Sequence, residues 1–227
     1  MQLDSVDKIV DRYLALVTKT PLRYKGKTYE PQTLVVSPSI FRGYTCPSGC
    51  GGCCGKFSLD YLPTDPRPAD ERIKPRQVPI NDTTVTIFTD PQGDNPGRFC
   101  RHLIPENGRC GIHGEHPFSC DFELIRAAVS QVPHKPNRLN TRLYGRGWAM
   151  LRAVDNERGA LCTMTEISEE SVADTVRRMV RLQEWADHFA IDSWVPEILT
   201  WMRDPNQRTI PLTLTPTLPT TAEDDAH

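Results

Sequence analysis

Cys46-Pro47-Ser48-Gly49-Cys50-Gly51-Gly52-Cys53-Cys54-Gly55 is the stretch around which this sequence is organised. It holds four of the eight cysteines of the chain and interleaves them with glycines. Three more cysteines, Cys100, Cys110 and Cys120, follow at an even spacing. Zinc ions and iron–sulfur clusters take about four thiolate or imidazole ligands, and closely spaced pairs let one tight turn supply two of them. The two groups of cysteines therefore predict a shared metal centre.

Length and charge narrow the class of protein. At 227 residues the chain is long enough to bury an apolar core without cysteine cross-links. A net charge of -2 gives no signal for nucleic acid or for an anionic membrane as a partner. The start, MQLDSVDKIVDRY, does not resemble a signal peptide, and no window approaches the roughly 18 apolar residues of a membrane span. We expect a soluble, cytoplasmic protein without a membrane partner, whose reduced cysteines bind metal rather than form disulfides.

Helices are expected at both ends of the chain. Apolar residues recur at helical spacing over residues 5–18. Ser168 begins a second amphipathic pattern that continues to about residue 189, with Glu169 and Glu170 in its first turn. Pro196 to Arg203 is predicted as a short terminal helix. A further short helix is predicted within Phe122 to Val132.

The strand signals are shorter. Thr33 to Val36 and Thr83 to Phe88 have strand composition, the latter inside a proline-rich insert over residues 56–99 that otherwise predicts a loop. Residues 147–154 and 160–164 flank a turn sequence and predict a hairpin. Together these patterns predict a small single α+β domain over residues 1–205, with a cysteine-rich metal centre, short strands or a hairpin, and packing helices at both ends. Residues 206–227 are predicted to form an extended Thr/Pro-rich tail, of which Thr209 to His227 would contact the body or a partner.

The first group of cysteines leaves the number of metals open. Cys46, Cys50 and Cys53 have suitable ligand spacing, and the interleaved glycines would let backbone amides point at the sulfurs. Cys53 and Cys54 are adjacent, so their side chains point to opposite sides of an extended backbone. Seven clustered cysteines also exceed the four that one centre requires. Two arrangements remain: one cluster with spectator thiols, or two metals that share the ligands Cys46, Cys50, Cys53, Cys54, Cys100, Cys110 and Cys120.

The second group of cysteines contains three histidines, His102, His113 and His116. Each is a possible ligand or acid–base group, although a histidine beside a metal often hydrogen-bonds to a ligand instead. Arg98, Arg101 and Arg109 are expected to offset the charge of the thiolates. The excess of cysteine over histidine favours an iron–sulfur cluster, with zinc as the alternative. The eighth cysteine, Cys162, is predicted to be a core residue.

These motifs resemble the YkgJ-like family of cysteine-cluster domains, described as zinc- or iron-chelating. The resemblance covers roughly residues 41–125 and rests on Gly51-Gly52-Cys53-Cys54, Cys100 with Leu103, Cys110-Gly111-Ile112, and His116-Pro117 before Cys120. It implies a metal or iron–sulfur centre in a small α+β domain, and relatives include flagellin lysine methylases. The chain departs from the family where the first cysteine pair encloses three residues instead of two. It departs also where His113 replaces a common tyrosine and where His116 and Asp121 replace common arginines.

Three functions follow from this sequence. The leading hypothesis is a metal-binding protein that holds an iron–sulfur cluster and has a redox or metal-handling role. An alternative is an enzyme that uses the cluster to modify a protein or another macromolecule. The spacing of Cys46, Cys50 and Cys53 matches radical S-adenosylmethionine enzymes, but the alternating strands and helices of their partial barrel are not predicted here. A third possibility is a zinc-stapled interaction module. Whether the chain is an enzyme, and its substrate, are left open.

Overall fold

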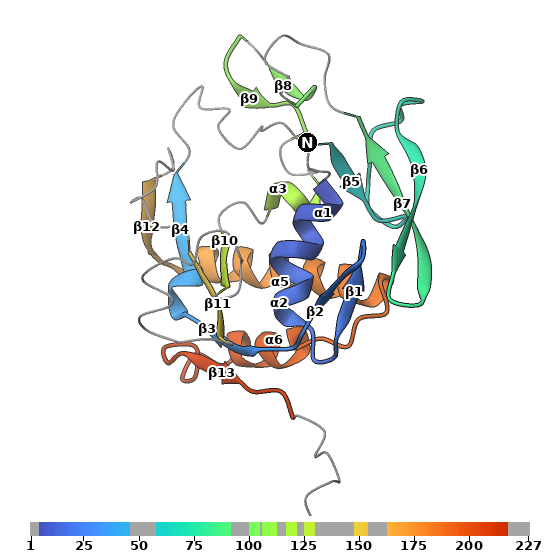
Figure 1. Ribbon diagram of the computed structural model, residues 1–227. Helices are drawn as coiled ribbons and strands as arrows, with labels where there is room; N and C mark the ends of the chain where they lie inside the picture. Colours follow the sequence, from blue (N-terminus) through green and yellow to red (C-terminus); the bar gives the residue numbers. More distant parts are fainter. Residues whose placement is uncertain are drawn as a thin grey trace, which may run out of the picture.

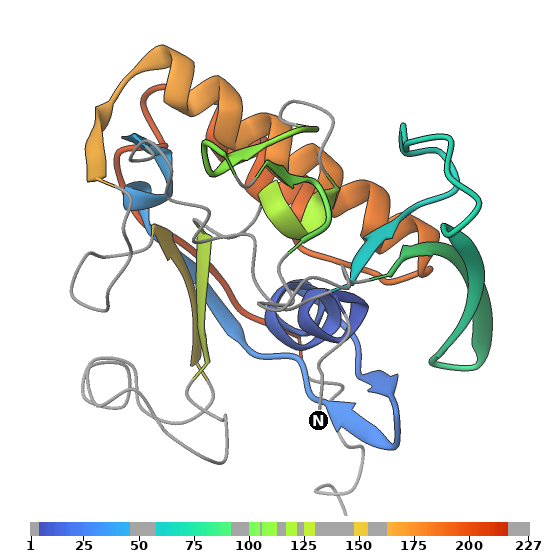
Figure 2. The ribbon, with the colours of Figure 1, turned by 90° about the horizontal axis from the view of Figure 1, so that it is seen from above.

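The longest helix, α5 (Glu169–His188), lies between two groups of strands on opposite sides of the molecule (Figures 1 and 2). The computed structural model describes residues 5–45, 58–91, 100–104, 106–112, 117–121, 125–129, 148–153 and 163–217. Ser168 caps α5 by accepting a hydrogen bond from the backbone of Ser171, whose hydroxyl accepts one from the backbone of Ser168. This reciprocal pair satisfies amides that the first helical turn leaves free. The helix predicted from Ser168 onward is confirmed.

The N-terminal helix is also confirmed. It consists of α1 (Ser5–Ile9), a π-helical turn η1 (Val10–Leu14) and α2 (Ala15–Val17) in direct succession. Its apolar face is fully buried in the main core, where Tyr13 meets the ring of Phe118 edge-on. Phe118 belongs to the short helix α3 (Phe118–Asp121) and also contacts Trp185 of α5, with ring centroids 5.7 Å apart. Aromatic side chains thus join helices from the start, middle and end of the chain.

The terminal helix α6 (Val195–Arg203) confirms the third helical prediction, with Pro196 in its first turn. Its start is fixed to α2, because the backbone N–H of Trp194 donates to the carbonyl of Val17 at 2.7 Å. Trp201 stacks on Phe41, which ends the 3-10 helix η2 (Pro38–Phe41). Helices from both ends of the sequence therefore pack in one mixed α+β domain. None of the described helices combines the length and apolar character required to span a bilayer.

A four-stranded sheet has the order β10-β11-β3-β13. Its strands are β3 (Thr33–Val36), β10 (Ile125–Val129), β11 (Trp148–Ala153) and β13 (Leu212–Leu214). The strand predicted at Thr33 to Val36 is confirmed, and it pairs in parallel with β11 and antiparallel with β13. The strand β13 lies in the segment predicted as an extended tail, so the first part of that segment pairs with the body of the domain.

Two sequence predictions in this region are wrong. The segment predicted as a helix within Phe122 to Val132 contains β10, which pairs antiparallel with β11 along its whole length. Pairing with a distant strand here outweighs the local helical pattern. The predicted hairpin is also not formed by the described residues: β11 pairs with β3 and β10, whereas β12 (Thr163–Ile167) pairs with β4 (Arg42–Thr45). The two segments form strands but do not pair with each other.

A three-stranded antiparallel sheet, order β5-β7-β6, occupies the proline-rich insert. Its strands are β5 (Leu59–Tyr61), β6 (Lys74–Ile80) and β7 (Thr83–Asp90). The strand predicted at Thr83 to Phe88 is confirmed and extends to Asp90. The prolines that suggested a loop, Pro75 and Pro79, lie in β6, which is an edge strand and needs only one side of its backbone for pairing. A small hairpin of β1 (Leu22–Tyr24) and β2 (Lys27–Tyr29) contacts this sheet.

The two faces of this sheet have different roles. Val78, Val85 and Ile87 belong to one face and pack in or against the main core. Tyr61 and Phe88 are paired across β5 and β7 and belong to the opposite face, because side chains alternate along a strand. That second face contributes Leu59, Tyr61 and Phe88 to a separate, smaller cluster of buried residues. This smaller cluster contains Cys100.

Candidate metal centre

Three of the seven predicted cysteine ligands, Cys100, Cys110 and Cys120, belong to the part of the chain that the structure describes, and among the described residues none of the three forms a disulfide. The other four lie outside the described residues, and so do His113 and His116, together with Arg98 and Cys162. These undescribed ligands are Cys46, Cys50, Cys53 and Cys54. The structure thus describes the second cysteine group and the elements that hold it.

A short hairpin brings Cys100 and Cys110 toward each other. The chain turns directly after Cys100, where the backbone N–H of Leu103 donates to the Cys100 carbonyl at 3.0 Å. Strand β8 (Leu103–Ile104) then pairs with β9 (Arg109–Cys110), which sets Cys110 opposite Leu103. Gly108 closes the hairpin with a φ of 65°, a left-handed conformation that glycine adopts without strain. The hairpin over residues 100–112 lies beside β5 and β7 in Figure 1.

Cys120 reaches the same region from α3. This helix has two differently directed side chains: Phe118 is buried in the main core, and Cys120 packs against the smaller cluster. We call this smaller cluster the Cys100 cluster; its members are Leu59, Tyr61 and Cys100, with Phe88, Ile112 and Cys120 packed against them. Two predicted ligands from separate elements therefore meet on one face of the β5-β7-β6 sheet.

The surroundings of Cys100 keep its thiol protonated. Burial raises its pKa above the ordinary value, and the negative charges of Cys110 and Asp90 act in the same direction. Two groups act in the opposite direction: the backbone N–H of His102, which hydrogen-bonds to the Cys100 sulfur, and the guanidinium of Arg101. An amide directed at a cysteine sulfur is an arrangement that stabilises a metal-bound thiolate. A bound cation would replace the proton of Cys100, because metal binding requires the deprotonated form.

Tyr61 lies at the centre of the Cys100 cluster and is 0% exposed. Burial raises the pKa of its hydroxyl, and the charges of Asp90, Cys120 and Cys100 raise it further. No hydrogen-bond partner for this hydroxyl exists among the described residues. A buried hydroxyl without a partner is uncommon in folded proteins, because it loses its hydrogen bonds to water without replacing them.

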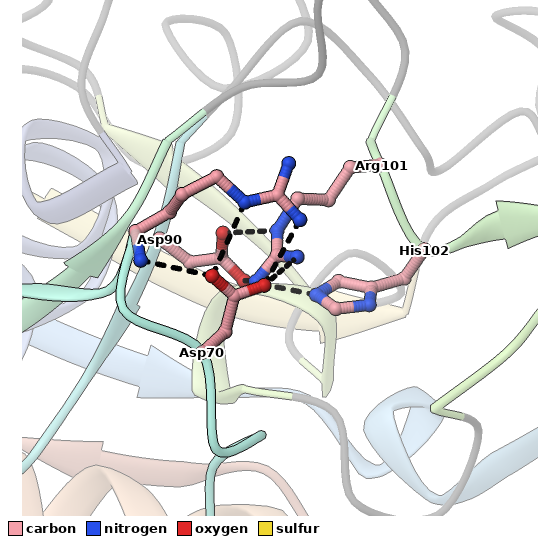
Figure 3. Close-up of polar contacts among 5 residues, drawn as sticks. Asp70, Asp90, Arg101 and His102 are labelled. Atoms are coloured by element: carbon pink, nitrogen blue, oxygen red, sulfur yellow. Dashed lines mark hydrogen bonds and ion pairs between the residues drawn. The ribbon is translucent and has the colours of Figure 1, made fainter.

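Charged side chains fasten the hairpin to the sheet (Figure 3). Asp90, at the end of β7, is 0% exposed and accepts hydrogen bonds from both Arg101 and His102. Arg101 Nη2 and His102 Nε2 lie 2.8 and 2.9 Å from Asp90 Oδ2. Arg101 also donates to Asp70 through Nη1 at 2.7 Å, and Asp70 is held by Arg72 as well. A buried carboxylate with several charge-assisted partners is a strong anchor.

Arg101 is expected to offset the charge of the thiolates, and its direct ion pairs are with the carboxylates of Asp90 and Asp70. Its positive charge also lowers the pKa of Cys100, which is the direction expected. Of the other two arginines, Arg109 is exposed. The role of Asp90 is not predicted by the sequence, where the available signal is its position two residues after the predicted strand.

The described cysteines Cys100, Cys110 and Cys120 have side chains that suit a soft metal, but these three alone do not form a complete site. Within the described part of the chain, no three His, Cys, Asp or Glu side chains are arranged to hold a metal ion. His102 lies between Cys100 and Asp90, and its ring nitrogen Nε2 is occupied by the carboxylate. This is the position expected of a histidine that supports the ligands.

Comparison with models of known protein families, with characterised proteins and with solved structures finds no match to this chain.

Proposed function

We propose that this chain is a metal-binding protein whose clustered cysteines hold an iron–sulfur cluster, with a redox or metal-handling role. The observation that carries the proposal is the meeting of Cys100 and Cys120 in one buried cluster, with Cys110 close enough for its charge to act on Cys100. These cysteines come from a hairpin and from a separate helix, so their association depends on the tertiary fold. Thiolates gathered from separate elements are typical of metal ligands.

The proposed ligands are Cys46, Cys50, Cys53 and Cys54 together with Cys100, Cys110 and Cys120. Chain connectivity supports the participation of the first group, because Leu59 of the Cys100 cluster follows Cys54 closely in sequence. Even a fully extended backbone would keep Cys54 within about 18 Å of Leu59. An iron–sulfur cluster, when bound, supplies one-electron transfer. The protein contributes the apolar surroundings from Leu59, Phe88 and Ile112, which limit access of water.

The test is anaerobic purification of the full chain, with analysis of iron, acid-labile sulfide and zinc. We expect a brown protein with visible absorbance that contains both iron and sulfide. A colourless protein that contains stoichiometric zinc would instead support the alternative in which the cysteines bind zinc. A protein that takes up neither metal after reconstitution with Fe2+ and sulfide, or with Zn2+, would refute the proposal.

Single substitutions connect the metal to these cysteines. Cys100→Ser and Cys120→Ser should each lower the iron and sulfide content at least severalfold, because serine is a poor ligand for soft metals. Cys162→Ser is the matched control, since Cys162 belongs to neither cysteine group, and it should retain the metal of the wild type. Full metal content in both Cys100→Ser and Cys120→Ser would show that the metal is bound elsewhere.

A further inference from the structure

The hydroxyl of Tyr61 is a donor whose acceptor is not found among the described residues. Tyr61 is 0% exposed, lies in β5 and packs directly with Cys100 in the Cys100 cluster. A phenol has an ordinary pKa of about 10, so at neutral pH it carries a proton that needs an acceptor. The fold therefore buries a hydrogen-bond donor beside two predicted metal ligands.

The nearby polar groups do not supply the acceptor. The charge of Asp90 raises the pKa of Tyr61, but the hydrogen bonds of this carboxylate come from Arg101 and His102. The remaining cluster members, Leu59, Phe88 and Ile112, are apolar. Among the described members of the Cys100 cluster, the sulfur atoms of Cys100 and Cys120 are the electron-rich side-chain groups that remain. Metal-bound sulfur, being more negative than a thiol, accepts hydrogen bonds well.

We propose that Tyr61 donates a hydrogen bond to a sulfur atom of the bound metal centre, and that it is a positioning residue that tunes this centre. The inference rests on the proposed function, because the acceptor belongs to the bound group or its thiolate ligands. The register of β5 against β7 fixes the position of the Tyr61 side chain, since Tyr61 is paired with Phe88. The Cys100 cluster encloses the tyrosine ring. Hydrogen bonds to sulfur withdraw negative charge from a cluster and make its reduction easier.

The test compares the wild type with Tyr61→Phe after anaerobic reconstitution of the full chain with Fe2+ and sulfide. Tyr61→Phe should keep the iron and sulfide content of the wild type, lower the reduction potential and shift the sulfur-to-iron charge-transfer bands. The metal-free forms provide a second measurement. Without metal, the urea midpoint of Tyr61→Phe should equal or exceed that of the wild type, because the substitution removes a hydroxyl that has no partner.

Tyr24→Phe is the matched control. Tyr24 is also buried, but its hydroxyl donates to Asp7 at 2.5 Å and it is not part of the Cys100 cluster. Tyr24→Phe should lower the urea midpoint of the metal-free protein and leave the potential and the spectrum unchanged. If the wild type binds no iron and sulfide, the proposed function fails. If the wild type binds them but Tyr61→Phe has the same potential and spectrum, only the role of Tyr61 is overturned.

Discussion

At the scale of single residues, Asp70 links the hairpin to the loop between β5 and β6, because it pairs with Arg101 of the hairpin and with Arg72 of the same loop. Its carboxylate accepts hydrogen bonds from the side chain and backbone of Arg72 and from the side chain of Arg101. The Arg72 contacts, followed by the Arg101 contact, hold the pKa of Asp70 well below its ordinary range. Asp70 therefore binds a proton less readily in the folded state than in the unfolded state, in which its carboxyl titrates near pH 4.

The ionisation of Asp70 should be visible in the way the free energy of unfolding changes with pH. The contribution of Asp70 is complete above about pH 4 and is lost as the pH falls toward the lowered pKa. Asp70→Asn should therefore unfold with a weaker pH dependence than the wild type below about pH 4. Urea unfolding of both proteins at several acidic pH values measures this slope. Equal slopes in the two proteins would contradict the assignment.

At the scale of elements, the hairpin over residues 100–112 is attached to β7 through Asp90. Asp90→Asn keeps the shape of the side chain but removes the charge that Arg101 and His102 contact. We expect a loss of about 3 kcal/mol in the free energy of unfolding, as for other broken buried ion pairs. Hydrogen exchange should also become faster at the amides of Leu103 and Gly111, which order the hairpin.

The matched control for Asp90→Asn is Asp82→Asn. Asp82 also pairs with an arginine, Arg23, but its side chain is 83% exposed. Water screens such a pair, so the change should cost about 0–1 kcal/mol and leave exchange in the hairpin unaltered. Similar losses of stability in the two variants would show that Asp90 does not anchor the hairpin.

The sequence predicts helices better than strand pairing, and these elements show why. The helix α5 is encoded locally by a capping serine and an apolar face, so its pattern is sufficient. The partner of a strand is chosen by residues far away in sequence: β11 pairs with β3 and β10, not with β12. The candidate site likewise combines features that are encoded locally with features that depend on residues distant in sequence. Cysteine spacing makes Cys100 a candidate ligand, but the contacts of Asp90 and Tyr61 arise only when the sheet packs against the hairpin.

At the scale of the whole molecule, the C-terminal strand β13 completes the four-stranded sheet at the edge next to β3. Its side chains Leu212 and Leu214 are half-buried against the main core. Removal of residues 212–227 should therefore cost about 2 kcal/mol in unfolding free energy. It should also promote self-association, because β3 would become an unpaired edge.

Urea unfolding and sedimentation measure these two effects. A chain that ends at residue 217 is the control, because it keeps β13 and its pairing with β3. It should behave as the full-length protein does. An equally stable, monomeric chain without residues 212–227 would show that β13 contributes little to the domain.

The position of β3 between β11 and β13 also has a consequence during protein synthesis. The strand β3 is translated before its neighbour β13, which lies roughly 180 residues later, an interval of about 10–40 s at common translation rates. During that interval β3, which carries the apolar residues Leu34, Val35 and Val36, lacks its pairing with β13. The nascent chain thus carries an incomplete sheet until β13 has been made, and during that interval β3 presents an unpaired apolar edge to other chains.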